Sequence, residues 1–296
     1  MENLRNYLMN VKADFEDYLA SGKALCDLSS MRFNSGNLPD YTNKHIQELY
    51  ILRYTYAYAF DYKYLYKMAL SDVKKKHIRV LSIGCGNYVD YFGLREAVSR
   101  SASIDYYGVD VIDWNYKFKP ATGDRISFSQ GDAFEYLLKQ DQLDYDLYIF
   151  PKSISEFSKR ELQQIGKTIA EKVHPEKSIK ILLSLRAKEQ SMDSDKANSA
   201  VLHDALCECG MLADPNNSKT YKLKSNIDQL RINKIDESFD NPTEIDYLLQ
   251  HLSNYCNENQ SFSKCNSCPV STNWRPKLNC TEFYSQIFNF QKESSC

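Results

Sequence analysis

VLSIGCGNYVD, residues 80–90, decides the fold: an apolar run ends in two glycines, Gly84 and Gly86, and a helical pattern follows. The chain has only 10 glycines in 296 residues, so a pair at one turn needs a physical reason. At the end of a strand, glycine allows a sharp turn and removes the Cβ that would keep a ligand from the backbone. The N–H groups of the next helix would face the same place. A tight turn without a ligand explains the pair about equally well, so the glycines alone leave both interpretations open.

Short apolar segments alternate with helical patterns from residue 78 onward. The segments are IRVLSIGC (78–85), DYYGVDVI (105–112), RISFSQGDAF (125–134), DYDLYIF (144–150) and SIKILLSL (178–185). This alternation predicts an α/β fold, with a mostly parallel sheet covered by helices on both faces. A helix over 159–173 is expected to begin at a capping box formed by Ser158 and Glu161. Further strands are expected over 219–224 and 228–235.

The chain divides into three regions by composition and periodicity. Residues 1–75 read as a helical N-terminal region, with one helix near the start and a long one from about 43 to 70. The first helix places these residues on one face: Leu4, Leu8, Val11, Phe15 and Tyr18. Residues 76–255 hold the alternating pattern and a last short helix from about 241 to 255. Residues 256–296 form a cysteine-rich tail with little periodicity.

Carboxylates and polar groups follow the predicted strands at their carboxyl ends. Asp110 ends the second strand, and Asp132 and Phe134 follow the third. Asp110 suits a ribose, because a carboxylate accepts two hydrogen bonds from its hydroxyls. Asp132 suits the amine of an adenine whose ring lies on Phe134. Each acid alone could equally cap a helix or stay solvated, but their order along one sheet edge favours a ligand site.

The series VLSIGCGNYVD, YYGVD, SQGDAF and DLYIFPKS resembles the motifs of class I S-adenosylmethionine-dependent methyltransferases. The resemblance covers about residues 78–240 and implies a Rossmann-like sheet of seven strands. It implies that Gly84 and Gly86 lie against the methionine part of the cofactor, that Asp110 holds the ribose, and that Asp132 and Phe134 hold the adenine. The cofactor-binding set implied by the resemblance is completed by Ser82, Ala133 and Phe150.

Two positions depart from the family pattern. Ser82 stands where the family usually has an acid that contacts the amino end of the cofactor, and Tyr88 stands where it often has a third glycine. A dinucleotide fingerprint, GxGxxG, fits less well, because its third glycine would be Val89.

Methyl transfer requires alignment of a nucleophile with the methyl carbon, and a base only where a proton must leave. Lys152, Ser153 and Glu156 follow the fourth strand and are the candidate catalytic residues. Turn capping by Ser153 and solvation of Glu156 are the alternatives. We expect S-adenosylmethionine-dependent methyl transfer, with RNA as the candidate acceptor. The alternative is a catalytically inactive methyltransferase-fold binding or assembly protein, similar to a ribosome-assembly factor, with a structural metal.

The tail carries a cysteine pattern typical of a metal site. The candidate ligands are Cys256, Cys265, Cys268 and Cys280. A CxxC pair places two thiolates on one metal, and two more close a tetrahedral site. Zinc is the expected metal, and an iron–sulfur cluster is the alternative, because CxxCP also surrounds such clusters. Free thiols or one disulfide would also account for the cysteines.

Tyrosines recur every fourth residue in the long N-terminal helix: Tyr50, Tyr54, Tyr58, Tyr62 and Tyr66. Core packing is the favoured explanation for this tyrosine stripe, and stacking on a base or contact with a protein partner is the other. The formal net charge is −2, which does not require a polyanionic partner. The sequence shows neither a signal peptide nor a membrane span, and we expect a cytoplasmic protein.

Overall fold

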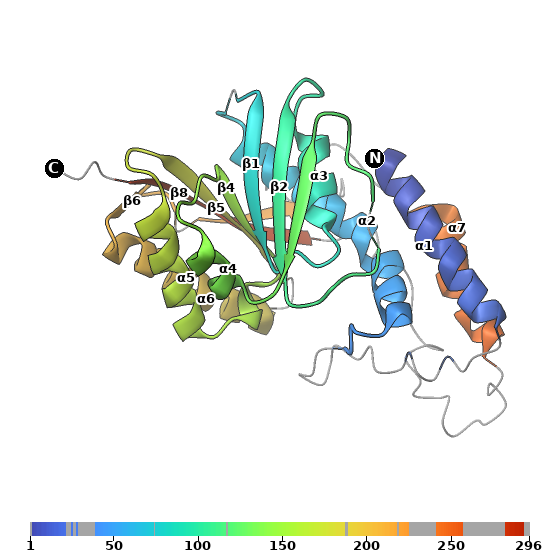
Figure 1. The fold of residues 1–296 in the computed structure, drawn as a ribbon. Helices are drawn as coiled ribbons and strands as arrows, with labels where there is room; N and C mark the ends of the chain where they lie inside the picture. Colours follow the sequence, from blue (N-terminus) through green and yellow to red (C-terminus); the bar gives the residue numbers. More distant parts are fainter. Residues whose placement is uncertain are drawn as a thin grey trace.

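An eight-stranded sheet forms the centre of the computed structural model (Figure 1). The structure describes residues 2–21, 25, 28, 39–73, 75–116, 118–186, 189–217, 219–224, 241–256 and 282–292. The strands are β1 (His77–Ile83), β2 (Ser103–Asp110), β3 (Arg125–Gln130), β4 (Leu147–Pro151), β5 (Ser178–Leu185), β6 (Met211–Ala213), β7 (Thr220–Lys224) and β8 (Glu282–Lys292). The helices are α1 (Glu2–Ala20), α2 (Lys44–Ala69), α3 (Val89–Ala97), α4 (Ala133–Lys139), α5 (Lys159–Lys172), α6 (Glu189–Glu208) and α7 (Thr243–Gln250), with short 3₁₀ turns η2 (Ile154–Glu156) and η3 (Leu252–Tyr255).

The strand order β3-β2-β1-β4-β5-β8-β6 is that of a Rossmann-like sheet, which confirms the predicted fold class. Strands β3, β2, β1, β4 and β5 are parallel, and β8 pairs antiparallel with β5. The order along the chain reverses between β1 and β4. In open α/β sheets, ligands bind at the carboxyl ends of the strands beside such a reversal.

The sheet has eight strands rather than the expected seven, because β8 carries two short partners along one side. β6 pairs with residues 290–292 and β7 with residues 282–286. The predicted strand over 219–224 is therefore present as β7. The strand expected over 228–235 lies outside the residues that the structure describes.

Strand β8 comes from the region that the sequence analysis assigned to the cysteine-rich tail. Its apolar side chains enter both layers of the core, with Ile287 packed on one face of the sheet and Phe288 and Phe290 on the other. A strand buried on both faces shows little alternation between apolar and polar residues, which explains why periodicity did not reveal it. The sheet thus extends beyond residue 255.

Helices cover both faces of the sheet (Figure 1). α1, α2, α3 and α7 lie on one side, and α4, α5 and α6 on the other. Alternate residues of β1 supply the two layers: Val80 packs with the first group, and Leu81 and Ile83 with the second. None of the helices that the structure describes is long and apolar enough to cross a membrane.

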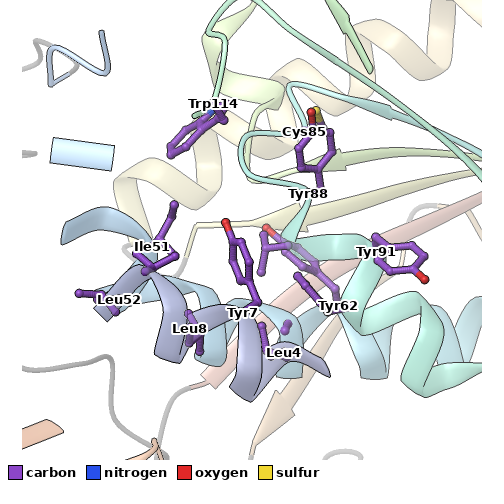
Figure 2. Close-up of a cluster of buried hydrophobic side chains, with 14 of the residues drawn as sticks. Leu4, Tyr7, Leu8, Ile51, Leu52, Tyr62, Cys85, Tyr88, Tyr91 and Trp114 are labelled. Atoms are coloured by element: carbon purple, nitrogen blue, oxygen red, sulfur yellow. The ribbon is translucent and has the colours of Figure 1, made fainter. Parts of the chain in front are cut away.

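The predicted N-terminal helices are confirmed, and α2 packs tightly on the sheet domain. Asn43 caps α2 by accepting a hydrogen bond from the His45 N–H at 2.9 Å. The expected apolar face of α1 is buried, and Figure 2 shows Leu4 and Leu8 of α1 beside Ile51 and Leu52 of α2. α3 crosses α2 at Gly93, where a Cβ would lie 2.6 Å from the Tyr62 Cβ. This close crossing holds α2, with its tyrosines, against the loop that follows β1.

Candidate functional site

The loop after β1 alternates left-handed and ordinary residues. Gly84 has a φ of 69°, Gly86 a φ of 53° and Tyr88 a φ of 60°. Glycine adopts this conformation without strain, whereas Tyr88 pays a steric cost. The ring of Tyr88 is buried against Tyr106, and this packing holds it in place.

Gly84 is required by the chain's own packing. A Cβ on Gly84 would lie 2.5 Å from the Cβ of Ser153, which follows β4. Ser153 is buried, and its hydroxyl donates to the Ile83 carbonyl at 2.6 Å. The first glycine therefore lets the ends of β1 and β4 meet. Gly86 is less crowded, because a Cβ there would find the Trp114 ring at an ordinary contact distance of 3.7 Å.

Asp110 joins the end of β2 to the glycine loop. One carboxylate oxygen accepts from the Gly86 N–H at 2.8 Å, and the other accepts from the Ile112 N–H at 2.9 Å. Burial raises the pKa of Asp110, while these backbone hydrogen bonds oppose the rise. A carboxylate has about four lone-pair sites, so acceptor capacity remains for a ligand.

Beside Asp110, an apolar side chain is exposed where β2 ends, next to the open backbone that follows β3. Val111 is 63% exposed, although it directly follows a partly buried carboxylate. The backbone of Gly131 donates to the Asp110 carbonyl at 2.9 Å, and a Cβ on Gly131 would meet open space. The sequence analysis missed Val111. The available signal was an apolar residue immediately after the acid that ends the second strand.

The predicted adenine residues lie next to this surface. Asp132 is exposed and caps α4 by accepting from the Glu135 N–H at 3.0 Å. Phe134 is half-buried, and Ala133 is buried in the core. Asp132 therefore has the capping role weighed above, and its exposure leaves further lone pairs accessible.

Ser82 and Phe150, by contrast, point into the interior. Phe150 is fully buried in the layer beneath α5 and α6. Ser82 is buried on the opposite face beside Asp90. Asp90 accepts from the Tyr106 hydroxyl at 2.7 Å and the Tyr66 hydroxyl at 3.1 Å. Burial raises the pKa of Asp90 to about 6, against the effect of these hydrogen bonds.

Two of the three candidate catalytic side chains are held by internal contacts. Ser153 packs against Gly84, as described. The Lys152 ammonium donates to Asp61 at 2.7 Å and to the Ser184 hydroxyl at 2.9 Å. Lys152 also has a left-handed backbone, with a φ of 61°. These contacts tie the turn after β4 to α2 and to β5.

Glu156 differs from Lys152 and Ser153, because its carboxylate makes no hydrogen bond or ion pair with the residues that the structure describes. Although Glu156 is exposed to water, desolvation by the surrounding protein and the charge of Asp110 raise its pKa to about 7. Arg186 opposes this shift, but its guanidinium is already paired with Asp195 at 2.7 Å. Glu156 is thus an unpaired acid at the end of β4.

An aromatic cluster lies over the glycine loop. The Trp114 ring centroid is 5.3 Å from that of Tyr41 and 5.5 Å from that of Tyr50. The buried Gln47 side chain donates to the carbonyls of Tyr41 and Asp113 at 2.7 and 3.1 Å. Gln47 therefore fixes the loop that carries Trp114. Figure 2 shows Trp114 beside Cys85 and Tyr88, with the α1 residues Leu4, Tyr7 and Leu8 below all three.

The tyrosine stripe on α2 runs from the core to this aromatic cluster. Tyr62 and Tyr66 are buried, which confirms core packing for that end of the stripe. Tyr50, Tyr54 and Tyr58 are half-buried, and their neighbouring ring centroids lie 5.1 and 5.5 Å apart. Burial raises the pKa of the Tyr50 hydroxyl, and the charge of Glu156 adds to this rise. This end of the stripe therefore lies near Glu156.

Most of the predicted metal ligands lie outside the residues that the structure describes. Cys265, Cys268 and Cys280 fall among residues that the structure does not describe, and Cys256 is half-buried. Within the described ranges, no three His, Cys, Asp or Glu side chains gather as a metal site. The four-cysteine site stays a prediction.

Comparisons with known proteins return solved methyltransferase structures. No protein-family model and no curated protein matches the chain. Among the solved structures, a SAM-dependent methyltransferase from Archaeoglobus fulgidus is 18% identical, with a TM-score of 0.39, over 77% of this chain and 94% of that one. Human N-acetylserotonin methyltransferase in complex with SAM is 15% identical, with a TM-score of 0.40, over 69% and 62%. An N-methyltransferase from Bradyrhizobium japonicum is 9% identical, with a TM-score of 0.36, over 79% and 94%.

Gly84→Ala tests the contact with Ser153. We expect the free energy of unfolding to fall by about 2–4 kcal/mol, from overpacking plus a left-handed alanine. In a Ser153→Gly background the same change should cost at least about 1 kcal/mol less, because the opposing Cβ is gone. A Ser153→Ala background keeps that Cβ and is the matched control. Equal costs of Gly84→Ala in all three backgrounds, measured by urea denaturation, would contradict the assignment.

Asp90 should make stability depend on pH. Its folded pKa is raised from 3.8 to about 6, so the folded state favours the protonated acid, and stability falls as pH rises through this window. Relative to wild type, Asp90→Asn should gain about 3 kcal/mol between about pH 3.5 and 7. Denaturant titrations at several pH values measure this difference. A difference that stays constant, or shrinks as pH rises, would show that Asp90 is ionised without penalty.

Proposed function

We propose that this protein binds S-adenosylmethionine along the carboxyl edge of β3, β2, β1 and β4 and transfers its methyl group to an acceptor. The observation that carries the proposal is the exposed Val111 beside the carboxylate of Asp110 and the bare backbone of Gly86. An apolar face, a hydrogen-bond acceptor and a chain free of Cβ atoms match the base, ribose and amino-acid parts of this cofactor.

Each group along the edge has a role in this proposal. Asp110 uses its remaining lone pairs to accept hydrogen bonds from the ribose. Val111 and Phe134 provide the apolar surface for the adenine, and Asp132 the acceptor for its amine. The bound cofactor supplies an electrophilic methyl group on its sulfonium. The protein's contribution is to align an acceptor with that carbon and to limit access of water.

The aromatic cluster supports a second candidate function, a binding or assembly protein without catalysis. Trp114 lies over Gly86, and Tyr41 and Tyr50 pack against Trp114. This cover occupies space above the glycine loop. Lys152 and Ser153 are also held by internal contacts. If the cover stays in place, the fold keeps its edge geometry but cannot take the methionine part of the cofactor.

RNA is our proposed acceptor. Support comes from the half-buried end of the tyrosine stripe, where Arg53 lies over the Tyr54 ring at 5.2 Å and Lys152 over the Tyr58 ring at 5.1 Å. Rows of aromatic rings with adjacent cations are typical of surfaces that bind single-stranded nucleic acid. The same end of the stripe is the proposed surface for a protein partner. We also retain zinc, or an iron–sulfur cluster, on the four tail cysteines.

Val111→Asp tests cofactor binding. Because Val111 is exposed, we expect this substitution to leave the fold intact. We expect at least a tenfold loss of affinity for S-adenosylmethionine by calorimetric titration, because a charge replaces the apolar surface under the adenine. Leu138→Asp, at an exposed apolar position late in α4, is the matched control and should bind like wild type. Failure of the folded wild-type protein to bind, or equal binding by Val111→Asp, would reject the proposed site.

The acceptor class is tested with labelled cofactor and total cellular RNA, DNA, protein and small molecules. We expect label in RNA, at a rate reduced at least tenfold by Val111→Asp and unaffected by Leu138→Asp. Label in another fraction would replace RNA as the acceptor. No label in any fraction, together with failure of the folded protein to bind the cofactor, would favour the non-catalytic function.

A further inference from the structure

We infer that Glu156 binds the ammonium end of the cofactor's amino-acid part. This inference rests on the proposed function, and it assigns Glu156 to cofactor binding rather than to the acceptor. Three observations carry it: the position of Glu156 on the sheet edge, the lack of a hydrogen-bond or ion-pair partner for its carboxylate among the described residues, and the engagement of Asp90 and Asp110 by groups of the protein.

The position of Glu156 is set by the contact between β1 and β4. Glu156 ends η2, and its backbone N–H donates to the Ser153 carbonyl at 2.9 Å. Ser153 in turn packs directly against Gly84. The short turn that carries Glu156 is therefore anchored to the glycine loop, next to the proposed methionine site.

The strand order then gives the ligand a direction. β2, β1 and β4 are consecutive neighbours: β2 ends at Asp110, β1 leads into the glycine loop, and β4 is followed by η2, which ends at Glu156. Neighbouring strands lie about 4.8 Å apart, so about 10 Å separates the ends of β2 and β4. A ligand whose ribose is bound at Asp110 can extend along the glycine loop. Its other end then lies near the end of β4. For S-adenosylmethionine, that far end bears an ammonium group.

The electrostatics at Glu156 favour a cation. Asp110 adds negative charge nearby, and the hydroxyls of Tyr41 and Tyr50 lie within the range of the Glu156 charge. Two positive groups on the neighbouring elements are already paired, Arg186 with Asp195 and Lys152 with Asp61, and a third, Arg53, lies over the Tyr54 ring. A ligand ammonium would therefore supply the missing counter-charge and stabilise the ionised form of Glu156.

Two other acids beside the glycine loop, Asp90 and Asp110, are already engaged by groups of the protein. Ser82 has no charge and is buried, and Asp90 beside it is occupied by Tyr66 and Tyr106 deep in the core. Asp110 holds Gly86 and Ile112 at the opposite end of the loop. Among the described residues at this edge, Glu156 is the acid left for a cation at β4.

A comparison of two ligands distinguishes a contact with the amino-acid part from an effect on binding of the adenosine part. S-Adenosylhomocysteine carries the amino-acid part, whereas 5′-methylthioadenosine has the same adenosine thioether without it. By calorimetry, Glu156→Gln should weaken S-adenosylhomocysteine at least tenfold and leave 5′-methylthioadenosine within twofold of wild type. Glu208→Gln, at an exposed carboxylate of α6, is the matched control and should change neither. Thermal unfolding confirms that each variant is folded.

The pH dependence of binding is a second readout. As Glu156 ionises between about pH 5.5 and 7.5, the affinity of wild type for S-adenosylhomocysteine should rise, whereas that of Glu156→Gln should stay flat. Affinity for 5′-methylthioadenosine should stay flat in both proteins.

The outcomes distinguish this inference from the proposed function. Binding of both ligands by wild type, with Glu156→Gln weakening both equally or neither, overturns the role of Glu156 and leaves the cofactor site intact. Binding of neither ligand by the folded wild-type protein overturns the cofactor site and the inference together. Selective loss of S-adenosylhomocysteine supports both.

Discussion

The contact of Ser153 with Gly84 is the constraint on which the carboxyl edge depends. It joins the ends of the two strands at which the order along the chain reverses, and it tolerates no side chain at residue 84. Through it, the turn after β4 is held against the loop after β1. The same loop is held to β2 by Asp110. The glycine loop thus brings together groups from three strands, through Gly84 on one side and Gly86 on the other.

The three acids around this loop differ in burial and in hydrogen-bond partners, and these differences indicate which are structural and which are available to a ligand. Asp90 is buried among tyrosine hydroxyls and belongs to the core. Asp110 is shared, because it holds the loop and keeps lone pairs for a ligand. The carboxylate of Glu156 makes no hydrogen bond with the residues that the structure describes, and both desolvation and the charge of Asp110 act against its ionised form. An acid with that cost and no internal partner is best explained by a ligand that carries positive charge.

Local signals in the sequence were sufficient for much of the fold. The cap at Asn43 and the capping box at Ser158 and Glu161 begin α2 and α5 where expected, because their side chains bond the nearby backbone. β8 was missed, because burial on both faces removes its alternation and its partners are distant in sequence. The use of Ser153 as a packing residue was equally invisible, since it depends on how two strand ends meet. The exposure of Val111 likewise follows from tertiary structure rather than from local pattern.

The aromatic cluster lies over the glycine loop, where the proposed cofactor would also lie. Whether the cluster moves aside therefore distinguishes cofactor binding from a non-catalytic role. Trp114, Tyr41 and Tyr50 favour a closed loop, whereas Asp110, Val111 and Glu156 are the three points at which we propose that one cofactor binds. A crystal structure of the protein grown with saturating S-adenosylhomocysteine tests this most directly. It should show the adenine on Val111, the ribose at Asp110 and the amino group at Glu156, with Trp114 displaced from Gly86 as far as the ligand requires. An aromatic cluster unchanged over an empty glycine loop, or a ligand bound away from this edge, would contradict the account.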